Sequence, residues 1–486
     1  MECSGGRSCP YLNGRGIWGL IRERDDLRER IVHIEGLMGL AEAKIRELTE
    51  ENKRLKEENS NLLHRIKRVA RKIFKPNISR DENGEGPKRG APKGHPGKGR
   101  LRPEEIHEEV DIYPRRCPCG STDIEGYEKS FDEHVVEDIE VRKKVSLFRM
   151  HYGRCRSCGK VVLAQGDGSI IPNSRIGPMG RSVGSYLHYL GIPYRKVKKI
   201  FKEVFNLDMS HTSLMHFDTK QAENGLGIFE GIKELVRTSS YVNIDETGWR
   251  VNARNCWLWV LVTDDAVLYV IDESRGSKVV TGILGDRYGG VLGIDFYSAY
   301  NPIDALGKQR CLPHLLREIK DIEEKNQFPL DSIDGRFTNE LKEVLKGSIA
   351  SWNEYKKGIK GIEELKEDRD RIISRMVEII QIPVEAPDTK RILERIMRHN
   401  NELFVFLDNP KVEPTNNRAE RQLRVNVIMR KITFGNRSSH GAKKHQIIMS
   451  IVETGRLNGV EPLKLFLSLT LGDTSFIDES IRIRGP

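Results

Sequence analysis

The sequence lacks the features of a membrane protein and of a disulfide-stabilised protein. No stretch approaches the ~18 to 20 consecutive apolar residues that a membrane span needs, and the opening MECSGGRSCPYLNGRG lacks the apolar core of a signal peptide. Eight cysteines in 486 residues are too few for a disulfide framework. We therefore expect a cytoplasmic protein with no membrane partner.

A large excess of one charge sign is also absent. The 81 Lys and Arg residues exceed the 71 Asp and Glu residues only slightly, which gives a net charge of +10. Such a balance permits a polyanionic partner without requiring one. The length exceeds that of one ordinary domain of roughly 100 to 200 residues, so we expect several modules.

A long heptad pattern is present near the N-terminus. From Leu27 to Ile73, alternating steps of four and three residues meet an apolar residue at twelve of fourteen positions, and the exceptions are Asn52 and Asn59. An asparagine at such a position lowers stability but fixes register and favours a two-stranded parallel coil. The alternative is a single amphipathic helix on a globular core, which so many repeats disfavour. We predict a coiled coil through which the chain self-associates.

The segment that follows, KPNISRDENGEGPKRGAPKGHPGKGR, has no core-forming pattern. It is rich in Gly and Pro, and its basic residues outnumber its acidic ones. This composition buries too little apolar surface to fold alone. We predict a linker whose positive charge also suits DNA phosphates.

Four of the cysteines form two close pairs. Cys117 and Cys119 stand in RRCPCGST, Cys155 and Cys158 stand in RCRSCGK, and strand-like alternation fills much of the sequence between them. Paired thiols followed by Gly are typical of a structural zinc site, and neither pair offers the His or carboxylate of an open catalytic one. The first pair is one residue shorter than the usual C-x-x-C. We predict that the four cysteines hold Zn²⁺ in a zinc-ribbon-like module.

A helical pattern with a break comes next. One helix runs through Val197 and Phe201 to Asn206, and Ser210 is placed to cap a second helix. The basic residues of the first helix are Arg195, Lys196, Lys198 and Lys199. The pattern predicts a helix-turn-helix that binds DNA, with an ordinary helical hairpin as the alternative.

The second half of the chain predicts a multidomain α/β protein. SYVNIDETGWRV, CWLWVLVT, AVLYVIDES and GVLGIDFYSAY are β-branched and aromatic runs bounded by turn residues, as expected of a sheet. Asp245 and Asp295 each follow apolar strand residues. A carboxylate is costly to bury there unless it is paired or bound to a cation, so we predict a metal at this edge of the sheet.

Together these motifs resemble one known family. Three stretches carry the resemblance: IDETGWRV; IDFYSAYN with CLPHLLREI; and EPTNNRAERQLR with RKITFGNRSSHGAK and ETGRLNG. In this order, behind the coil, linker, cysteine pairs and helix-turn-helix, they are similar to the transposases of insertion sequence family 66. The resemblance covers nearly the whole chain and implies an RNase H-like catalytic core with an Asp, Asp, Glu triad.

By position, the resemblance assigns the triad to Asp245, Asp295 and Glu420, and it adds His314, which would approach the scissile phosphate or orient a carboxylate. The expected cofactor is Mg²⁺ or Mn²⁺, because carboxylates bind such ions, and two ions can activate a nucleophile and stabilise a leaving oxygen. Asp295 and Glu420 are 125 residues apart. The charge-rich helical tract between them predicts a helical insertion.

Other acids fit the site less well. Glu246 follows Asp245 and would point to the opposite face of a strand, so we expect it to be solvated or paired. Asp264 and Asp265 are typical of a turn between strands. Glu413, seven residues before Glu420, is the second choice for the last ligand.

Basic residues gather around Glu420. The residues proposed to bind DNA there are Arg418, Arg421, Arg424, Arg430 and Lys431, and Arg437, Lys443 and Lys444 extend the set. Dense positive charge of this kind suits a phosphate backbone. Asn416 and Asn417 are expected to cap the helix that carries Glu420.

We predict a nucleoid-associated DNA transposase that binds element ends, cleaves DNA and transfers a strand to target DNA as a homodimer or larger complex. The alternatives are a non-enzymatic, dimeric DNA-binding regulator derived from a transposase, and an RNase H-like nuclease without strand transfer. The predicted domains are a coiled coil (20–74), the linker (75–105), a zinc-ribbon-like module (106–170), a helix-turn-helix region (171–225), an RNase H-like catalytic domain (236–320 and 405–470), a helical insertion (321–404) and a C-terminal tail (471–486).

Overall fold

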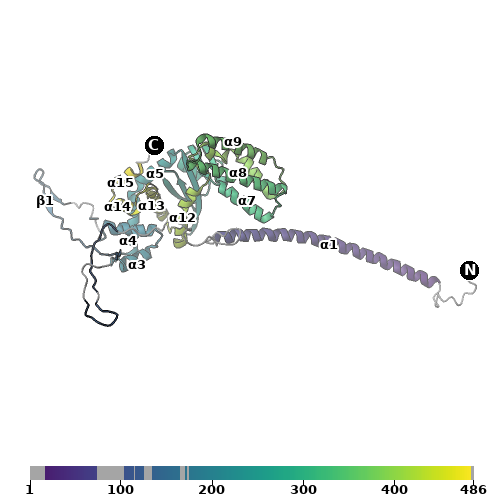
Figure 1. The fold of residues 1–486 in the computed structure, drawn as a ribbon, viewed down its shortest axis with the longest axis horizontal. Coiled ribbons are helices and arrows are strands. Elements are labelled where there is room, and N and C mark those ends of the chain that lie inside the picture. The colour runs from purple at the N-terminus through teal and green to yellow at the C-terminus, as the bar shows by residue number, and fades with distance from the viewer. Residues whose placement is uncertain are drawn as a thin grey trace, which may run out of the picture. The chain divides into compact units, whose positions relative to one another are not determined.

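The computed structural model describes residues 17–73, 103–113, 115–124, 134–164, 170–171 and 174–482 (Figure 1). The chain divides into two units, residues 1–131 and 132–486, and each is described by itself. Most of the predicted linker lies outside the described residues. Among the described residues, no helix is both long enough and apolar enough to cross a membrane.

In the first unit, the heptad region forms one helix, α1 (Ile17–Ile73). The large apolar residues of the predicted seam are 44% to 62% exposed; they are Leu27, Ile31, Ile34, Met38, Ile45, Leu48, Leu55 and Leu62. The prediction of a helical N-terminus is confirmed. Within the described chain, the apolar seam of this helix has no cover.

The second unit begins with a small hairpin. Its strands are β1 (Tyr152–Arg154) and β2 (Val161–Leu163), which pair antiparallel around the second cysteine pair. The strand-like alternation before it gave a wrong expectation, because residues 134–150 form no strand. Alternate apolar residues such as Ile139, Val145 and Leu147 are 80% or more exposed there. Alternation alone cannot make a strand without a neighbour to pair with.

Three helices follow: α2 (Pro178–Tyr189), α3 (Tyr194–Glu203) and α4 (His211–Asn224). Val197 and Phe201 of α3 pack with Leu214 and Phe217 of α4 in a small apolar core. The predicted cap is correct, since the Ser210 hydroxyl accepts from the N–H of Ser213 at 3.0 Å. Seven residues, 204–210, connect α3 to α4.

A five-stranded sheet forms the centre of this unit, so the prediction of a mixed α/β protein with a central sheet is confirmed. Its strands are β3 (Tyr241–Val251), β4 (Arg254–Val262), β5 (Val267–Asp272), β6 (Arg287–Ile294) and β7 (Asp304–Arg310). Their spatial order is β5-β4-β3-β6-β7. The first three form an antiparallel meander, and β6 and β7 run parallel to β3.

Helices from both flanks of the sequence pack on this sheet (Figure 1). They are α5 (Leu226–Thr238), α6 (Ser277–Leu284), α12 (Asn417–Thr433) and α13 (Ser439–Leu457), while α14 (Pro462–Leu471) and α15 (Ser475–Arg482) pack on α13. α12 packs against β3 and β4, and α13 packs against β5. The buried core includes Trp259 and Tyr269.

The chain between β7 and α12 is helical and has an apolar core of its own, which includes Phe337, Leu341 and Leu365. Its elements are α7 (Leu312–Asn326), α8 (Ile333–Lys356), α9 (Ile362–Ile379), α10 (Pro387–Arg398) and α11 (Val405–Asp408), with a 3₁₀ turn, η2 (Asn400–Glu402). A second 3₁₀ turn, η1 (Ser298–Tyr300), follows β6. α12 then returns the chain to the sheet.

Candidate active site

Asp245 and Asp295 lie at matching positions of two neighbouring strands. β3 and β6 pair in parallel, with Asn243 opposite Gly293 as the last pair. Asp245 is two residues beyond Asn243, and Asp295 is two residues beyond Gly293 and directly after β6. Since parallel strands end at the same edge of a sheet, their register brings the two acids to one edge.

Negative charge accumulates around Asp245. Burial raises the pKa of Asp245 well above its ordinary value, and the charges of Glu246, Asp295 and Glu420 raise it further. The Glu246 N–H donates to Asp245 Oδ1 at 2.8 Å and opposes the increase. A raised carboxyl pKa means that the charged form is disfavoured where it stands, as expected of a buried carboxylate beside other acids.

Glu420 reaches this cluster from the first turn of α12. His314 Nε2 on α7 lies 3.7 Å from Glu420 Oε1, and an Arg317 guanidinium nitrogen lies at the same distance. Ligand atoms of Cys311, His314 and Glu420 all lie within 4.8 Å of one another. The start of α7 and the start of α12 therefore meet beside the acids.

His314 is held in a setting that favours its neutral form. Burial lowers the pKa of His314, and the Arg317 charge lowers it further, although Asp295 and Glu420 oppose this. Its Nδ1 is buried and makes no hydrogen bond with the described residues. A neutral imidazole near carboxylates can accept or donate one proton or bind a cation.

Asn416 joins the elements that carry the acids. Its side chain does not cap α12 as expected, but donates from Nδ2 to the Ile244 carbonyl at 2.7 Å. It also accepts from Asn243 Nδ2 at 3.0 Å, and its backbone N–H donates to Cys311 Sγ at 3.2 Å. Asn416 thus fixes the start of α12 against β3 and against the start of α7.

Glu246 is paired, as predicted. Its carboxylate accepts from Arg275 at 2.7 Å and from the Tyr300 hydroxyl at 2.5 Å. The Arg275 guanidinium also lies over the rings of Trp257 and Tyr297, at 4.4 and 4.0 Å from their centres. Glu246 therefore has a cationic partner, whereas Asp245 has no ion pair among the described residues.

The remaining candidate acids are also engaged. Glu413 accepts from Arg418 at 2.7 Å, and Arg418 bonds Asp264 at 2.5 Å. Asp264 and Asp265 lie between the end of β4 and the start of β5, so the predicted turn is confirmed. Arg418, expected to face DNA, instead ties the start of α12 to this turn.

The other basic residues divide by exposure. Arg421, Arg424 and Lys431 are exposed on α12, at spacings that keep them near one face of the helix with Glu420. The Arg430 guanidinium turns back to the Gly248 carbonyl. On α3, three of the four predicted DNA contacts are exposed and Lys198 is half-buried; the exposed ones are Arg195, Lys196 and Lys199.

Lys444 lies outside this exposed set. Its ammonium group donates to the Met215 carbonyl at 3.1 Å and to the Tyr194 hydroxyl at 3.4 Å. Burial lowers the pKa of Lys444. This lysine therefore connects α13 to α3 and α4 instead of facing solvent.

Each cysteine pair sits in a tight turn. The Cys117 carbonyl accepts from the Gly120 N–H at 2.8 Å, and the Cys155 carbonyl accepts from the Gly159 N–H at 2.9 Å. Both glycines have positive φ angles, +95° and +73°. One thiol in each pair has a lowered pKa. A hydrogen bond from the Ser121 backbone lowers the pKa of Cys119, and one from the Cys158 backbone lowers the pKa of Cys155. Lowered thiol pKa values favour the thiolate that binds metal.

Some residues of the site were missed by sequence reasoning. Arg317 and Cys311 stand in the CLPHLLREI segment. Their position on either side of His314 was the only sequence feature that indicated a place in the site. Arg275 lies 29 residues from its partner Glu246. No local pattern connects these two, so only the folded sheet could have paired them.

The fold and the site define a mixed α/β protein that gathers acidic side chains at one end of its central sheet, beside an exposed basic helix. A family model described as "Transposase IS66 family" matches residues 183–444, more than half of the sequence, and the chain belongs to this family of transposases.

Similar curated proteins come from Sinorhizobium fredii (strain NBRC 101917 / NGR234) and are named as uncharacterized. They include y4qI, 26% identical over 49% of this chain and 49% of its own length, and y4jD, 21% identical over 48% and 50%. A third, y4hP, is 23% identical over 74% of this chain and 71% of its own length. The match spans about half the length of the first two.

Proposed function

We propose that this protein is a DNA transposase whose active site consists of Asp245, Asp295 and Glu420. The observation that carries the proposal is the strand register that brings Asp245 and Asp295 to one edge of the sheet, where burial and the charges of Glu246, Asp295 and Glu420 raise the pKa of Asp245. They come from β3, from the residue after its parallel neighbour β6, and from the first turn of α12, which packs against β3. Membership of the IS66 family supplies the reaction class.

The strand order supports an RNase H-like catalytic domain. Three antiparallel strands followed by two strands parallel to the first give the order β5-β4-β3-β6-β7. The first acid then lies on the central strand and the second at the end of its parallel neighbour. The third arrives on a helix after the helical insertion.

The donor set fits Mg²⁺ or Mn²⁺. Carboxylate oxygens are the ligands these ions prefer, and a bound ion would supply charge neutralisation at the phosphate and activation of the oxygen nucleophile. Asp245, Asp295 and Glu420 would hold it. The charge of Glu246 is already balanced by Arg275, and Glu420 lies 3.7 Å from Arg317, whereas no ion pair is found for Asp245 or Asp295 among the described residues.

The neighbouring residues can bind and orient DNA. Arg317 and the exposed Arg421 and Arg424 lie on the two helices whose first turns meet at Glu420, where phosphates would approach. His314 can hold or transfer a proton beside Glu420. Asn416 fixes the start of α12 so that Glu420 stays with the strand acids.

The test is a strand-transfer assay with labelled element ends, target DNA and Mg²⁺. We expect Asp245→Asn to abolish cleavage and joining, because the substitution removes a ligand charge but keeps the size of the side chain. Glu246→Gln is the matched control: it also neutralises an acid, one residue away, and should retain cleavage. Equal loss in both variants would contradict the assignment, and cleavage without joining would favour a nuclease.

The outlying modules complete the proposal. We propose that the exposed basic residues of α3 bind element ends as part of a helix-turn-helix, and that the two cysteine pairs hold structural Zn²⁺. The lowered thiol pKa values and the turns at Gly120 and Gly159 support zinc. Metal content of the purified protein tests this, and clearly substoichiometric zinc would contradict it. The seam of α1 would join two copies, and the complex would associate with the nucleoid.

A further inference from the structure

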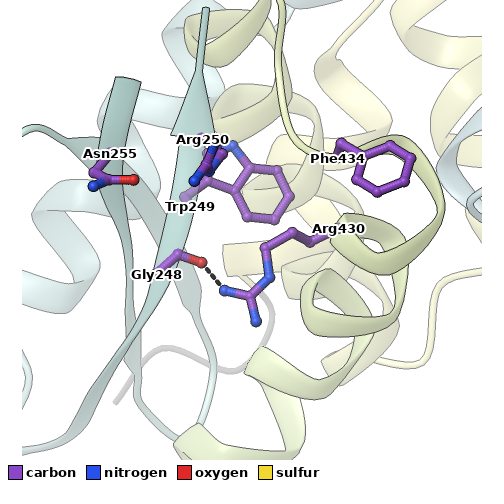
Figure 2. A pocket seen from close by; sticks show the side chains of 6 residues that line it. All are labelled: Gly248, Trp249, Arg250, Asn255, Arg430 and Phe434. Atoms are coloured by element: carbon purple, nitrogen blue, oxygen red, sulfur yellow. Dashed lines mark hydrogen bonds between the residues drawn. The ribbon is translucent and has the colours of Figure 1, made fainter. Parts of the chain in front are cut away.

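A pocket of about 440 Å³ lies beside the candidate active site (Figure 2). Its lining residues are Gly248, Trp249, Arg250, Asn255, Arg430 and Phe434. Figure 2 shows Arg430 of α12 pointing toward Gly248 of β3, with Trp249 and Arg250 on the same strand and Phe434 at the end of α12. The volume falls within the roughly 300 to 1,000 Å³ typical of sites for small molecules.

Two backbone hydrogen bonds, which we call the clamp, join the β3–β4 hairpin to the chain after α12 at the edge of the pocket. The Asn252 N–H donates to the Asn436 carbonyl, and the Asn436 N–H donates to the Arg250 carbonyl, both at 2.9 Å. Gly435 makes this approach possible. It has a φ of +92°, and a Cβ there would lie 2.3 Å from the Arg250 carbonyl oxygen.

Phe434 is placed by the same clamp. It ends α12 in the left-handed conformation, with φ of +61°, and its side chain is 76% exposed. A large aromatic residue in this conformation is uncommon. The turn therefore exposes an aromatic ring at the rim of the pocket. The hydrophobic effect alone would favour burying such a ring.

The polar lining suits an anion joined to a flat ring. Arg430 donates to the Gly248 carbonyl and, at 3.4 Å, to the Thr247 hydroxyl, which fixes its guanidinium. Arg250 and Asn255 are opposite each other in the β3–β4 pairing, and both are exposed. Neither side chain has a hydrogen-bond partner among the described residues. Two guanidinium groups can bind a phosphate, and the amide and the aromatic face can bind a base.

The position of the pocket connects it to the acids. Gly248 is three residues beyond Asp245 on β3, roughly 10 Å at about 3.3 Å per residue. α12 also runs from Glu420 at its start to Arg430 and Phe434 at its end. A DNA strand leaving the acids along these elements would reach the pocket after about three nucleotides at a rise of ~3.4 Å.

We propose that this pocket, which we call the Phe434 pocket, binds one unpaired nucleotide of the DNA substrate close to the cleavage position. Phe434 stacks on the base, and Arg250 and Arg430 bind the adjoining phosphate. The inference rests on the proposed function, since it takes DNA as the substrate. The new element is that one nucleotide at the DNA end leaves the duplex and binds in this pocket. The pocket is separate from the acids proposed to bind metal.

The experiment compares two fluorescein-labelled duplexes of the same sequence, one blunt and one with a three-nucleotide 3′ overhang, by fluorescence anisotropy with the full chain. We expect the wild type to bind the overhang duplex about tenfold more tightly, because stacking of one base on an aromatic side chain is worth that much. Phe434→Ala should reduce the preference to about twofold or less, and Phe434→Tyr should retain it.

Arg254→Ala is the charge control. Arg254 is exposed on the same hairpin but does not line the pocket, so this variant should weaken binding of both duplexes equally and leave the preference unchanged. A wild type that binds both duplexes with one affinity overturns the inference while DNA binding stands, and so does an unchanged preference in Phe434→Ala. Failure to bind either duplex contradicts the proposed function itself.

Discussion

Neighbouring residues of this chain differ sharply in their electrostatic surroundings. Asp245 and Glu246 are adjacent on β3, yet Glu246 bonds Arg275 and Tyr300 while Asp245 is surrounded by other acids. Burial raises the pKa of both carboxyls, but only Glu246 has hydrogen bonds from a cation and a hydroxyl to oppose it. Within the described chain, an unpaired buried acid and a structural ion pair thus arise from one dipeptide because successive side chains leave a strand on opposite faces.

The surroundings of His445 predict how the stability of the second unit depends on pH. Its ring stacks on Trp249 at 5.2 Å, and Nε2 bonds Asn426 Oδ1 at 2.7 Å. Burial lowers the pKa of His445 to about 3, and the charges of His188 and Lys444 add to this. The unfolded chain takes up a proton below about pH 6.5, while the folded chain stays neutral. Stability is therefore complete above pH 6.5 and falls by up to ~1.4 kcal/mol per pH unit on acidification toward pH 3.

We expect His445→Gln to reduce this acid sensitivity, because glutamine can donate the same hydrogen bond and has no charge to gain. The midpoint of thermal unfolding, recorded between pH 7 and pH 4.5, measures the acid sensitivity. The midpoint should fall less steeply in the variant than in the wild type, although lost stacking on Trp249 lowers it at pH 7. His440→Gln removes an exposed histidine of the same helix and should follow the wild type. Parallel curves for His445→Gln and wild type would show the assignment to be wrong.

Among the elements, β5 depends most on side chains for its backbone hydrogen bonds. It is an edge strand, and its Val267, Tyr269 and Ile271 N–H groups donate to Thr454 Oγ1, Ser450 Oγ and Gln446 Oε1. The three acceptors are spaced four residues apart on one face of α13. An exposed strand edge can pair with other chains. α13 covers this edge, and its side chains accept the hydrogen bonds of the free backbone N–H groups.

Replacing Thr454 should loosen this edge. Thr454→Val keeps the shape but leaves the buried Val267 N–H and carbonyl without their partner, which costs about 1–3 kcal/mol. Hydrogen exchange by mass spectrometry should show at least roughly tenfold faster exchange in the β5 peptide, with β3 unchanged. Thr212→Val, the same change at an exposed position of α4, should leave both peptides unaffected. Unchanged exchange in Thr454→Val would mean that β5 does not rely on α13.

Local signals explain what could be predicted at this scale. Ser210 was identifiable as a cap, and Asp264 and Asp265 as a turn, because both depend on residues within a few positions. The bond between Asn243 and Asn416 spans 173 residues and left no local trace, so Asn416 was expected to cap its own helix. The Phe434 pocket was missed for the same reason: its walls come from β3, β4 and the end of α12. The strand prediction for residues 134–150 was wrong for a different reason. The local alternation is typical of a strand, but no partner strand pairs with it among the described residues.

At the scale of the whole molecule, the two units differ in how they dispose of apolar surface. The second unit buries its apolar residues in three cores, around the sheet, in the helical insertion and among α2 to α4. In the first unit, α1 leaves its seam uncovered. A long helix in water takes most of its stability from packing an apolar face, and exposed apolar surface of this extent marks an interaction site. We therefore expect the seam to need a second copy of the chain.

Charge placed in the seam should separate the copies. Ile45→Lys with Leu48→Lys replaces two apolar seam residues, and each lysine would meet its counterpart in a parallel pair, where like charges are costly to bury. Light scattering coupled to size exclusion should show a dimer or larger species for the wild type and a monomer for the variant. The matched control exchanges the charges of a neighbouring exposed ion pair, Lys44→Glu with Glu47→Lys, which changes two charges outside the seam and should keep the assembly. If the lysine variant keeps the mass of the wild type, the seam is not the contact. If both variants dissociate, the assembly depends on surface charge and not on the apolar heptads.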